Sequence, residues 1–230
     1  MKSVIITGAT SMLGLALIRE CIRNDTRVLA IVRENSKKRS NIIMSALVDI
    51  IECDLESIKD LELKLDTEFD AFYHFAWKST NNSSRNIVED QNTNIASTLE
   101  AIKFARRSNV IKFIGAGSQA EYGRKFKKVC SDSEVSPDSA YGVAKYAAGK
   151  LSSILSRQLE LEFIWTRIFS TYGEHDMSST MIMYCIDCFL NNKVPSLTKC
   201  EQEWDYLNCN DAAKAFYLIG KYGKDQSIYN

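Results

Sequence analysis

The chain has 230 residues, with 29 basic and 29 acidic side chains and a hydrophobic content of 45%. This length is enough to bury a sizeable core as one large domain, or as one domain with a small appendage. The formal net charge of zero argues against a partner that is nucleic acid or an anionic membrane. No apolar run approaches the roughly 18 residues of a membrane span, and the N-terminus has no signal-peptide segment. We therefore expect a cytoplasmic protein whose seven scattered cysteines are reduced.

A strand, a glycine turn and a helix open the chain. Residues 2–7 are a β-branched apolar run typical of a buried parallel strand, and residues 15–22 have helical periodicity. A glycine turn between such elements allows the backbone to approach a dinucleotide pyrophosphate at the helix N-terminus. An ordinary strand–helix turn also favours glycine, so a purely structural turn is the alternative. The turn residues expected to bind the cofactor are Gly8, Thr10, Ser11, Met12, Leu13 and Gly14.

The end of the second strand bears on the choice of cofactor. Residues 27–32 complete a βαβ unit, and NAD-binding proteins usually place an acid shortly afterwards to bind the ribose 2′-hydroxyl. Here Arg33 comes first, with Ser36, Lys37, Lys38 and Arg39 just beyond. A basic, hydroxyl-bearing loop suits the 2′-phosphate of NADP. Because Glu34 adjoins Arg33, a solvated surface loop is the alternative, and NAD stays open as the cofactor.

The later elements continue the alternation of strands and helices. Strands are expected over residues 50–55, 70–77, 110–114 and 163–169, with short ones over 194–197 and 203–207. Helices are expected over residues 88–108, 140–158, 181–190 and 211–219. This rhythm predicts an α/β fold of the Rossmann type with a doubly wound parallel sheet. Cys185 and Cys188 form a CxxC pair, which we interpret as packing on a helix face rather than a metal site. His74 lies in an apolar strand, which favours a packed histidine over a catalytic base.

Three tyrosine–lysine pairs have a spacing of four residues: Tyr141/Lys145, Tyr146/Lys150 and Tyr217/Lys221. On a helix, this spacing places both side chains on one face. The cation would then lower the pKa of the tyrosine toward working pH, so that the phenol can exchange a proton with a substrate oxygen. The spacing alone does not choose among the three pairs.

Taken in order, these landmarks resemble the extended short-chain dehydrogenase/reductase family, the NAD-dependent epimerase/dehydratase group acting on nucleotide sugars. The resemblance covers nearly the whole chain and implies a dinucleotide-binding domain over residues 1–170, with a substrate lobe over 171–230 interleaved with the last Rossmann elements. The family strand that residues 227–230 resemble is normally followed by further residues, so we expect this lobe to be incomplete. The residues that carry the resemblance are Thr7-Gly8 through Gly14, Asp54-Leu55, His74 to Ala76, Asn94, Ser118, Tyr122-Gly123, Tyr141/Lys145, Arg167, Tyr172-Gly173 and Trp204 to Tyr206.

The resemblance selects one of the tyrosine pairs. The family tyrosine begins the helix after the fifth strand, and that strand ends on a hydroxyl residue, which Tyr141 and Ser118 match. Tyr141 is then the general acid/base, Lys145 lowers its pKa and holds the nicotinamide ribose, and Ser118 hydrogen-bonds the reacting oxygen. Tyr146 lies about 140° around the helix and faces elsewhere. Beyond the glycine turn, the expected cofactor-binding residues are Arg33, Asp54, Leu55, Phe75, Ala76, Asn94, Tyr141, Lys145 and Ile168.

The resemblance also narrows the reaction. The 4,6-dehydratases of the family carry an acidic pair directly after the hydroxyl residue, whereas this chain has Gln119 and Ala120. The remaining hypotheses are an NADP-dependent reductase of a 4-keto-6-deoxy nucleotide sugar in polysaccharide biosynthesis, which the basic loop favours, and a 4-epimerase that keeps NAD bound. A non-catalytic NAD(P)-binding protein is the third hypothesis. The resemblance further implies a homodimer, formed through a helical bundle that includes the helix of Tyr141.

Two positions depart from the family pattern. Ser11 replaces the middle glycine of the phosphate turn, where a side chain can restrict the approach to pyrophosphate. Trp204 replaces an arginine that often meets the substrate diphosphate. A Trp-Asp-Tyr-Leu sequence at that place resembles sugar-reductase relatives, so we do not interpret Trp204 as loss of function.

Overall fold

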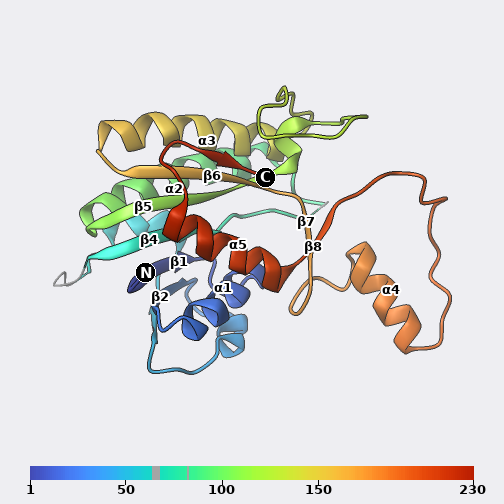
Figure 1. Cartoon of the computed structure of the whole chain (residues 1–230), viewed down its shortest axis with the longest axis horizontal. Helices are drawn as coiled ribbons and strands as arrows, with labels where there is room; N and C mark the ends of the chain where they lie inside the picture. Colours follow the sequence, from blue (N-terminus) through green and yellow to red (C-terminus); the bar gives the residue numbers. More distant parts are fainter. Residues whose placement is uncertain (64–67, 82) are drawn as a thin grey trace.

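The computed structural model describes residues 1–63, 68–81 and 83–230. Its centre is a seven-stranded parallel sheet in the order β3-β2-β1-β4-β5-β6-β9 (Figure 1). The strands are β1 (Ser3–Thr7), β2 (Arg27–Val32), β3 (Val48–Glu52), β4 (Phe69–His74), β5 (Val110–Ser118), β6 (Glu162–Ile168) and β9 (Ile228–Tyr229). The strand order runs outward from β1 in both directions. The expected doubly wound α/β fold is confirmed.

Helices cover both faces of this sheet, which explains why its central strands are almost continuously apolar. The helices α1 (Met12–Arg23) and α5 (Cys209–Tyr222) pack together on one face, while α2 (Val88–Arg107) and α3 (Ala140–Gln158) pack together on the other (Figure 1). Within the described residues, the 3₁₀ turns that join the elements are η1 (Lys37–Asn41), η2 (Leu55–Asp60) and η3 (Gln119–Tyr122). The last two place expected site residues at the edge of the sheet.

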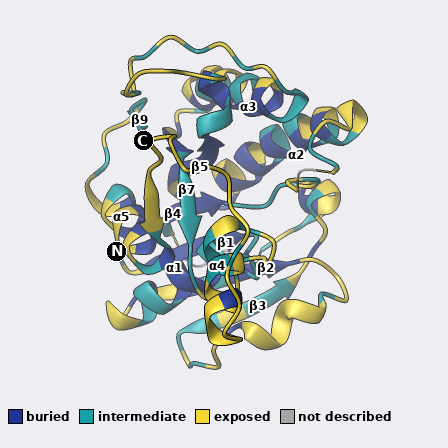
Figure 2. Cartoon of the chain, turned by 90° about the vertical axis from the view of Figure 1, so that its right-hand side faces the viewer, coloured by how far each residue is buried: buried dark blue, intermediate teal, exposed yellow. Residues whose placement is uncertain are grey.

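A smaller unit stands beside the main sheet. The strands β7 (Ser170–Tyr172) and β8 (Tyr206–Asn208) pair in parallel, and α4 (Met181–Leu190) lies between them in sequence. Figure 2 shows α4 as mostly exposed, and Cys188 is its buried residue while Cys185 is half-buried. The helix α5 and strand β9 then return to the main body, so the chain from residue 171 onward is divided between the two parts (Figure 1). The boundary expected at residue 170 remains a prediction.

Several expected strands differ from the structure. Those expected over residues 50–55 and 70–77 end three residues early, at Glu52 and His74. Residues 194–197 form no strand, since Val194 is exposed and Pro195 has no backbone donor for a ladder. The strand expected over 203–207 begins only at Tyr206. By contrast, β5 extends four residues beyond its expected end at Ile114. Gly115 and Gly117 hide this extension from strand propensity, yet both are needed there, because a Cβ atom at Gly115 would lie 2.4 Å from the Trp165 ring.

Along the described ranges of the chain, no helix combines the length and the apolar character that crossing a membrane requires.

Candidate active site

The carboxyl ends of the parallel strands bring most of the expected site residues to one edge of the sheet. Binding sites of open α/β sheets lie at this edge, near the point where the strand order reverses. Here that point is between β1 and β4. The residues at the edge are the Gly8–Gly14 turn after β1, Arg33 after β2, Asp54 and Leu55 after β3, Phe75 and Ala76 after β4, Ser118 ending β5 and Ile168 ending β6.

The turn after β1 has the close backbone packing that a dinucleotide site requires. Gly8 has a φ of +66°, and a Cβ atom there would lie 2.7 Å from the backbone nitrogen of Ala76. A Cβ atom on Gly14 would lie 2.5 Å from the carbonyl oxygen of Gly8. Both positions therefore need glycine.

Ser11, the departure from the family glycine, has a structural task in this turn. It is the N-cap of α1, and its Oγ accepts a hydrogen bond of 3.1 Å from the backbone N–H of Gly14. The first amides of a helix have no acceptor within the helix, so those of Met12 and Leu13 stay suited to an anion. The turn fits a pyrophosphate with serine at this position.

The outer edge of the proposed cofactor site carries exposed charged residues. Arg33 is exposed directly after β2, and Asp54 is exposed as the N-cap of η2. Arg39 is already paired with Glu52 at the end of β3. Of the two arginines, Arg33 is therefore the better candidate for an added phosphate group.

Asn94 is buried in α2 and holds the segment that follows β4. Its Oδ1 accepts from the backbone N–H of Lys78 at 2.8 Å, and its Nδ2 donates to the carbonyl oxygen of Lys78 at 2.9 Å. One turn earlier, Gln91 accepts a hydrogen bond of 2.9 Å from the indole N–H of Trp77. These contacts fix Trp77 at the site, whereas a direct bond from Asn94 to the cofactor stays a prediction.

The start of α3 carries the tyrosine and the lysine. Ser139 caps this helix, accepting from the backbone N–H of Gly142 at 3.2 Å, and Tyr141 lies half-buried in its first turn. Lys145 is only 4% exposed, and its ammonium donates to the carbonyl oxygen of Ala116 at 2.6 Å. This contact ties the helix to the end of β5.

Ser118 completes the group at the end of β5. Its Oγ accepts from the backbone N–H of Ala120 at 3.1 Å, which leaves the hydroxyl hydrogen for another acceptor. The Ser118 side chain also interacts with the Tyr141 hydroxyl, and this contact alone acts to lower the Tyr141 pKa. The structure thus brings together the three residues expected to be catalytic.

The electrostatics of the site correct one expectation. Burial raises the pKa of Tyr141 above its ordinary value, and Ser118 and Arg85 oppose this rise. The Arg85 guanidinium lies 4.8 Å from the centre of the Tyr141 ring. The net pKa of Tyr141 is therefore not the lowered one that the four-residue spacing predicts. The Lys145 ammonium lies 5.8 Å from the centre of the Tyr141 ring, but its hydrogen bond goes to Ala116 and it sits closer to the Trp77 ring. Burial lowers the pKa of Lys145 itself to about 7.

The two other tyrosine–lysine pairs lie away from this site. Tyr217 lies on the buried face of α5, with its hydroxyl 3.0 Å from that of Thr26. Tyr146 lines a separate cavity of about 140 Å³ between α3 and β6, as its predicted direction requires. The interpretation of His74 as a packed residue is confirmed, since its ring nitrogens lie 2.9 Å from Thr7 Oγ1 and 3.3 Å from Thr98 Oγ1. Burial lowers the pKa of His74 to about 3.

Three further residues at the site were not found from the sequence. Trp77 and Arg85 come from the segment after β4, which has no periodicity that would indicate which side chains turn inward. Glu121 lies fully buried on η3 behind Ser118. The sequence does contain a signal for Glu121, because Ser118 and Glu121 have the three-residue spacing of a capping box. The structure contains that capping box.

The family model described as the NAD dependent epimerase/dehydratase family matches residues 4–230. The chain belongs to this family. The resemblance inferred from the sequence is therefore confirmed, and with it the expectation of an NAD(P)-dependent enzyme.

The individual relatives have low sequence identity to this chain but align with most of its length. A putative UDP-glucose 4-epimerase from Methanocaldococcus jannaschii is 25% identical over 92% of this chain and 71% of that protein. A CDP-abequose synthase from Salmonella typhimurium is 25% identical over 98% of this chain and 72% of that protein. Among solved structures, a UDP-glucuronic acid 4-epimerase from Bacillus cereus in complex with NAD superposes with a TM-score of 0.82 at 19% identity, covering 98% of this chain and 76% of that one. This last likeness confirms the fold.

Proposed function

We propose that this family member is an NADP-preferring reductase of a 4-keto-6-deoxy nucleotide sugar, and that it serves polysaccharide biosynthesis. The observation that carries the proposal is the joint position of Ser118, Tyr141 and Lys145 beside a dinucleotide turn, with no carboxylate at positions 119 and 120. A nucleotide-sugar substrate is consistent with the names of the relatives, which include a CDP-abequose synthase and a putative UDP-glucose 4-epimerase.

The site residues suit the reduction of a ketone. Bound NADPH supplies the hydride that adds to the carbonyl carbon. The Ser118 hydroxyl hydrogen-bonds the carbonyl oxygen as negative charge develops on it, and the Tyr141 phenol donates the proton that completes the alcohol. Burial keeps the pKa of Tyr141 above its ordinary value, so the phenol is protonated at neutral pH, as a reductase requires. The protonated fraction of Lys145 supplies a positive charge beside these groups.

Dehydration is disfavoured by the position of the one carboxylate on η3. Glu121 has no exposed surface, and its Oε1 accepts from the Ser118 backbone N–H and the Trp165 indole N–H, both at 2.9 Å. Its Oε2 accepts from Arg167 at 2.8 Å. A carboxylate engaged on both oxygens and sealed from solvent has no access to a substrate proton. The site therefore lacks the acid/base pair that eliminating water from a sugar needs.

A nucleotide-sugar 4-epimerase with tightly bound NAD is the second candidate, supported by the name of the Methanocaldococcus relative. Cofactor analysis of the purified protein separates the two. The reductase proposal predicts little NAD released on denaturation and oxidation of added NADPH when a 4-keto-6-deoxy nucleotide sugar is supplied. Stoichiometric NAD, with interconversion of two sugar epimers and no consumption of NADPH, would overturn it. Cofactor binding without either reaction would favour the third candidate, a non-catalytic NAD(P)-binding protein.

We also propose a cytoplasmic homodimer formed through α2 and α3. The observation that supports it is a row of exposed apolar side chains along α3, namely Val143, Leu151 and Ile154. Light scattering on the purified chain tests the proposal. Twice the mass of one chain is expected, and Leu151→Lys with Ile154→Lys should reduce it to the mass of a monomer.

A further inference from the structure

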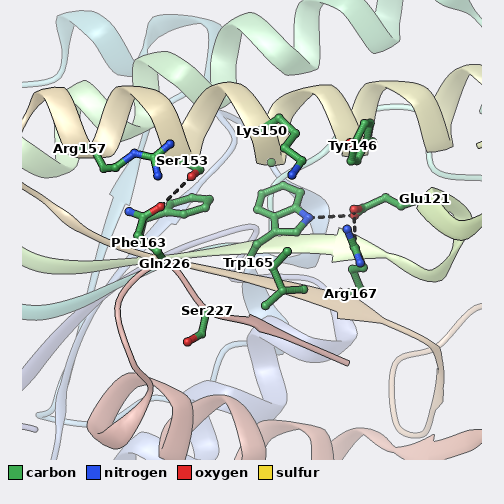
Figure 3. A pocket seen from close by; sticks show the side chains of 12 residues that line it. Glu121, Tyr146, Lys150, Ser153, Arg157, Phe163, Trp165, Arg167, Gln226 and Ser227 are labelled. Carbon is green, nitrogen blue, oxygen red and sulfur yellow. Dashed lines mark hydrogen bonds and ion pairs between the residues drawn. The ribbon is translucent and has the colours of Figure 1, made fainter. Parts of the chain in front are cut away.

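A buried ion pair lies directly behind the proposed active site. Glu121 is 0% exposed and Arg167 is 3% exposed, and the Arg167 Nε donates to Glu121 Oε2 at 2.8 Å. Figure 3 shows both side chains meeting beside the indole of Trp165, where Glu121 is also bound. Burying a charged pair is costly unless its remaining hydrogen-bonding groups also find partners.

Both members of this ion pair make several further hydrogen bonds. Glu121 accepts from the Ser118 backbone, from Trp165 and from Arg167. Arg167 in turn donates to the Tyr122 hydroxyl at 2.8 Å and to the carbonyl oxygen of Ser131 at 3.1 Å. The packing leaves little freedom, because a Cβ atom on Gly117 would lie 2.4 Å from Glu121 Oε1 and 2.3 Å from Trp165 Nε1. The Glu121 carboxylate is therefore held in one place.

This hydrogen-bond network includes Ser118, the serine expected to be catalytic. Ser118 and Glu121 form a reciprocal capping box, in which the carboxylate binds the Ser118 N–H while the Ser118 hydroxyl caps η3. The backbone of Ser118 is thus fixed by Glu121, and its Oγ is fixed by Ala120. A hydroxyl held at both ends is pre-organised for an oxygen that develops charge only in the transition state.

The charge of Glu121 also affects the other two residues expected to be catalytic, Lys145 and Tyr141. Burial lowers the pKa of Lys145 to about 7, and Glu121 opposes this by raising it. Burial raises the pKa of Tyr141, and Glu121 adds to the rise. The other titratable or charged groups around Lys145 and Tyr141 are His74 on β4 and Arg85 before α2. The Lys145 ammonium also lies over the Trp77 ring. Among these groups, Glu121 is the acid that favours the charged form of Lys145.

We propose that Glu121 is a positioning residue for the active site: its buried carboxylate fixes Ser118 through the capping box, and its negative charge supports the ammonium of Lys145. It does not touch the substrate, because both of its oxygens are occupied and its side chain is sealed from solvent. Arg167 orients the carboxylate through its Nε hydrogen bond. This proposal rests on the proposed function for its effect on turnover, but the effect on Lys145 is independent of any substrate.

The test compares the titration of Lys145 in the wild-type protein and in Glu121→Gln, which keeps an acceptor oxygen while removing the charge. Side-chain NMR of ¹⁵N-lysine-labelled protein follows the titration, with Lys145→Arg identifying its signal. Lys145 should titrate near pH 7 in the wild type. In Glu121→Gln it should titrate about one pH unit lower or more. The matched control is Glu162→Gln, at the opposite end of the strand that carries Arg167, which should leave the titration unchanged.

A second variant guards against misfolding. Glu121→Leu with Arg167→Met replaces the whole ion pair by apolar groups, which buried pairs often tolerate. This variant should shift the Lys145 titration in the same direction but by less, because losing the positive charge of Arg167 acts in the opposite sense. Near-ultraviolet circular dichroism checks the packing of Trp165 in each variant. An unchanged Lys145 titration in either folded variant would overturn the proposal.

Turnover supplies an independent readout. With NADPH and a 4-keto-6-deoxy nucleotide sugar, Glu121→Gln should lower kcat about tenfold and change KM little, because Ser118 acts in the transition state. A raised KM with an unchanged kcat would contradict a positioning role. If the wild type itself reduced no sugar, the proposed function would fail while the Lys145 titration would still decide the role of Glu121.

Discussion

The ammonium of Lys145 lies 3.6 Å from the centre of the Trp77 ring. The lysine is almost fully buried, and its hydrogen bond to Ala116 leaves the aromatic face as the second support for its charge. A desolvated cation over tryptophan gains about 2 kcal/mol. Trp77 is therefore part of the environment that determines whether Lys145 is charged at neutral pH.

Replacing Trp77 tests this support. Trp77→Leu removes the aromatic face and should lower the pKa of Lys145 by about one unit, because the protonated form loses its stabilisation. Trp77→Phe keeps a ring and loses only the N–H that binds Gln91, so it serves as the matched control. Side-chain NMR of labelled lysine measures both. Equal titrations in the two variants would show that the ring does not support the cation.

Lys145 should cost the protein stability at neutral pH. Burial lowers its folded-state pKa from 10.5 to about 7, so the unfolded chain binds more protons between these values. The free energy of unfolding should therefore rise with pH across that window. Lys145→Met removes the effect and should be more stable than the wild type at pH 6, by roughly 2 kcal/mol after the lost bond to Ala116 is counted. Urea unfolding from pH 6 to pH 10 measures the difference, which should shrink with rising pH.

His74 should make the fold sensitive to acid. Burial lowers its pKa from 6.5 to about 3, so the unfolded state binds more protons between these values and stability falls as the pH drops through them. His74→Gln has no titrating group and should lose less stability between pH 7 and pH 4 than the wild type does. Thermal unfolding across that range checks this. Parallel losses in both proteins would assign the acid sensitivity to other groups.

Arg33 should determine the preference between the two cofactors. A charged hydrogen bond to the 2′-phosphate contributes about 1.5–3 kcal/mol, so Arg33→Gln should raise the KM for NADPH by about tenfold or more. The KM for NADH should stay unchanged, because NADH lacks that phosphate. Arg27→Gln, at the opposite end of β2, is the matched control with the same change in charge. A parallel increase for both cofactors would contradict a contact with the 2′-phosphate.

The sequence predicts the fold well wherever short-range pattern and burial agree. The ranges of β2 and of helices α3 and α4 coincide with the predicted ones, because apolar patterning marks all three and a serine cap also marks the start of α3. The extension of β5 was missed, since Gly115 and Gly117 are poor strand formers that the Trp165 indole requires. The strand expected at residues 194–197 does not form, because this exposed segment contains Pro195 and has no partner strand to pair with among the described residues.

The candidate site, like the fold, could be predicted only in part from the sequence. Ser118, Tyr141 and Lys145 follow from order along the chain, and the structure places them together. The direction of the lysine ammonium does not follow from a four-residue spacing, because Ala116 and Trp77 come from other strands and loops. Glu121 is an intermediate case. Its capping-box spacing was readable, whereas its burial against Arg167 and Trp165 depends on tertiary packing.

In the proposed mechanism Tyr141 completes a hydride transfer to a keto-sugar, and the most direct measurement follows a labelled hydride. NADPH that carries deuterium at the reactive position is mixed with a 4-keto-6-deoxy nucleotide sugar and the purified protein, and the sugar is analysed by mass spectrometry. The wild type should place one deuterium on the sugar carbon while NADPH is oxidised. Tyr141→Phe should abolish the transfer and leave the affinity for the cofactor nearly unchanged. Label transfer by Tyr141→Phe at the wild-type rate, or an unlabelled sugar product from the wild type, would contradict the account.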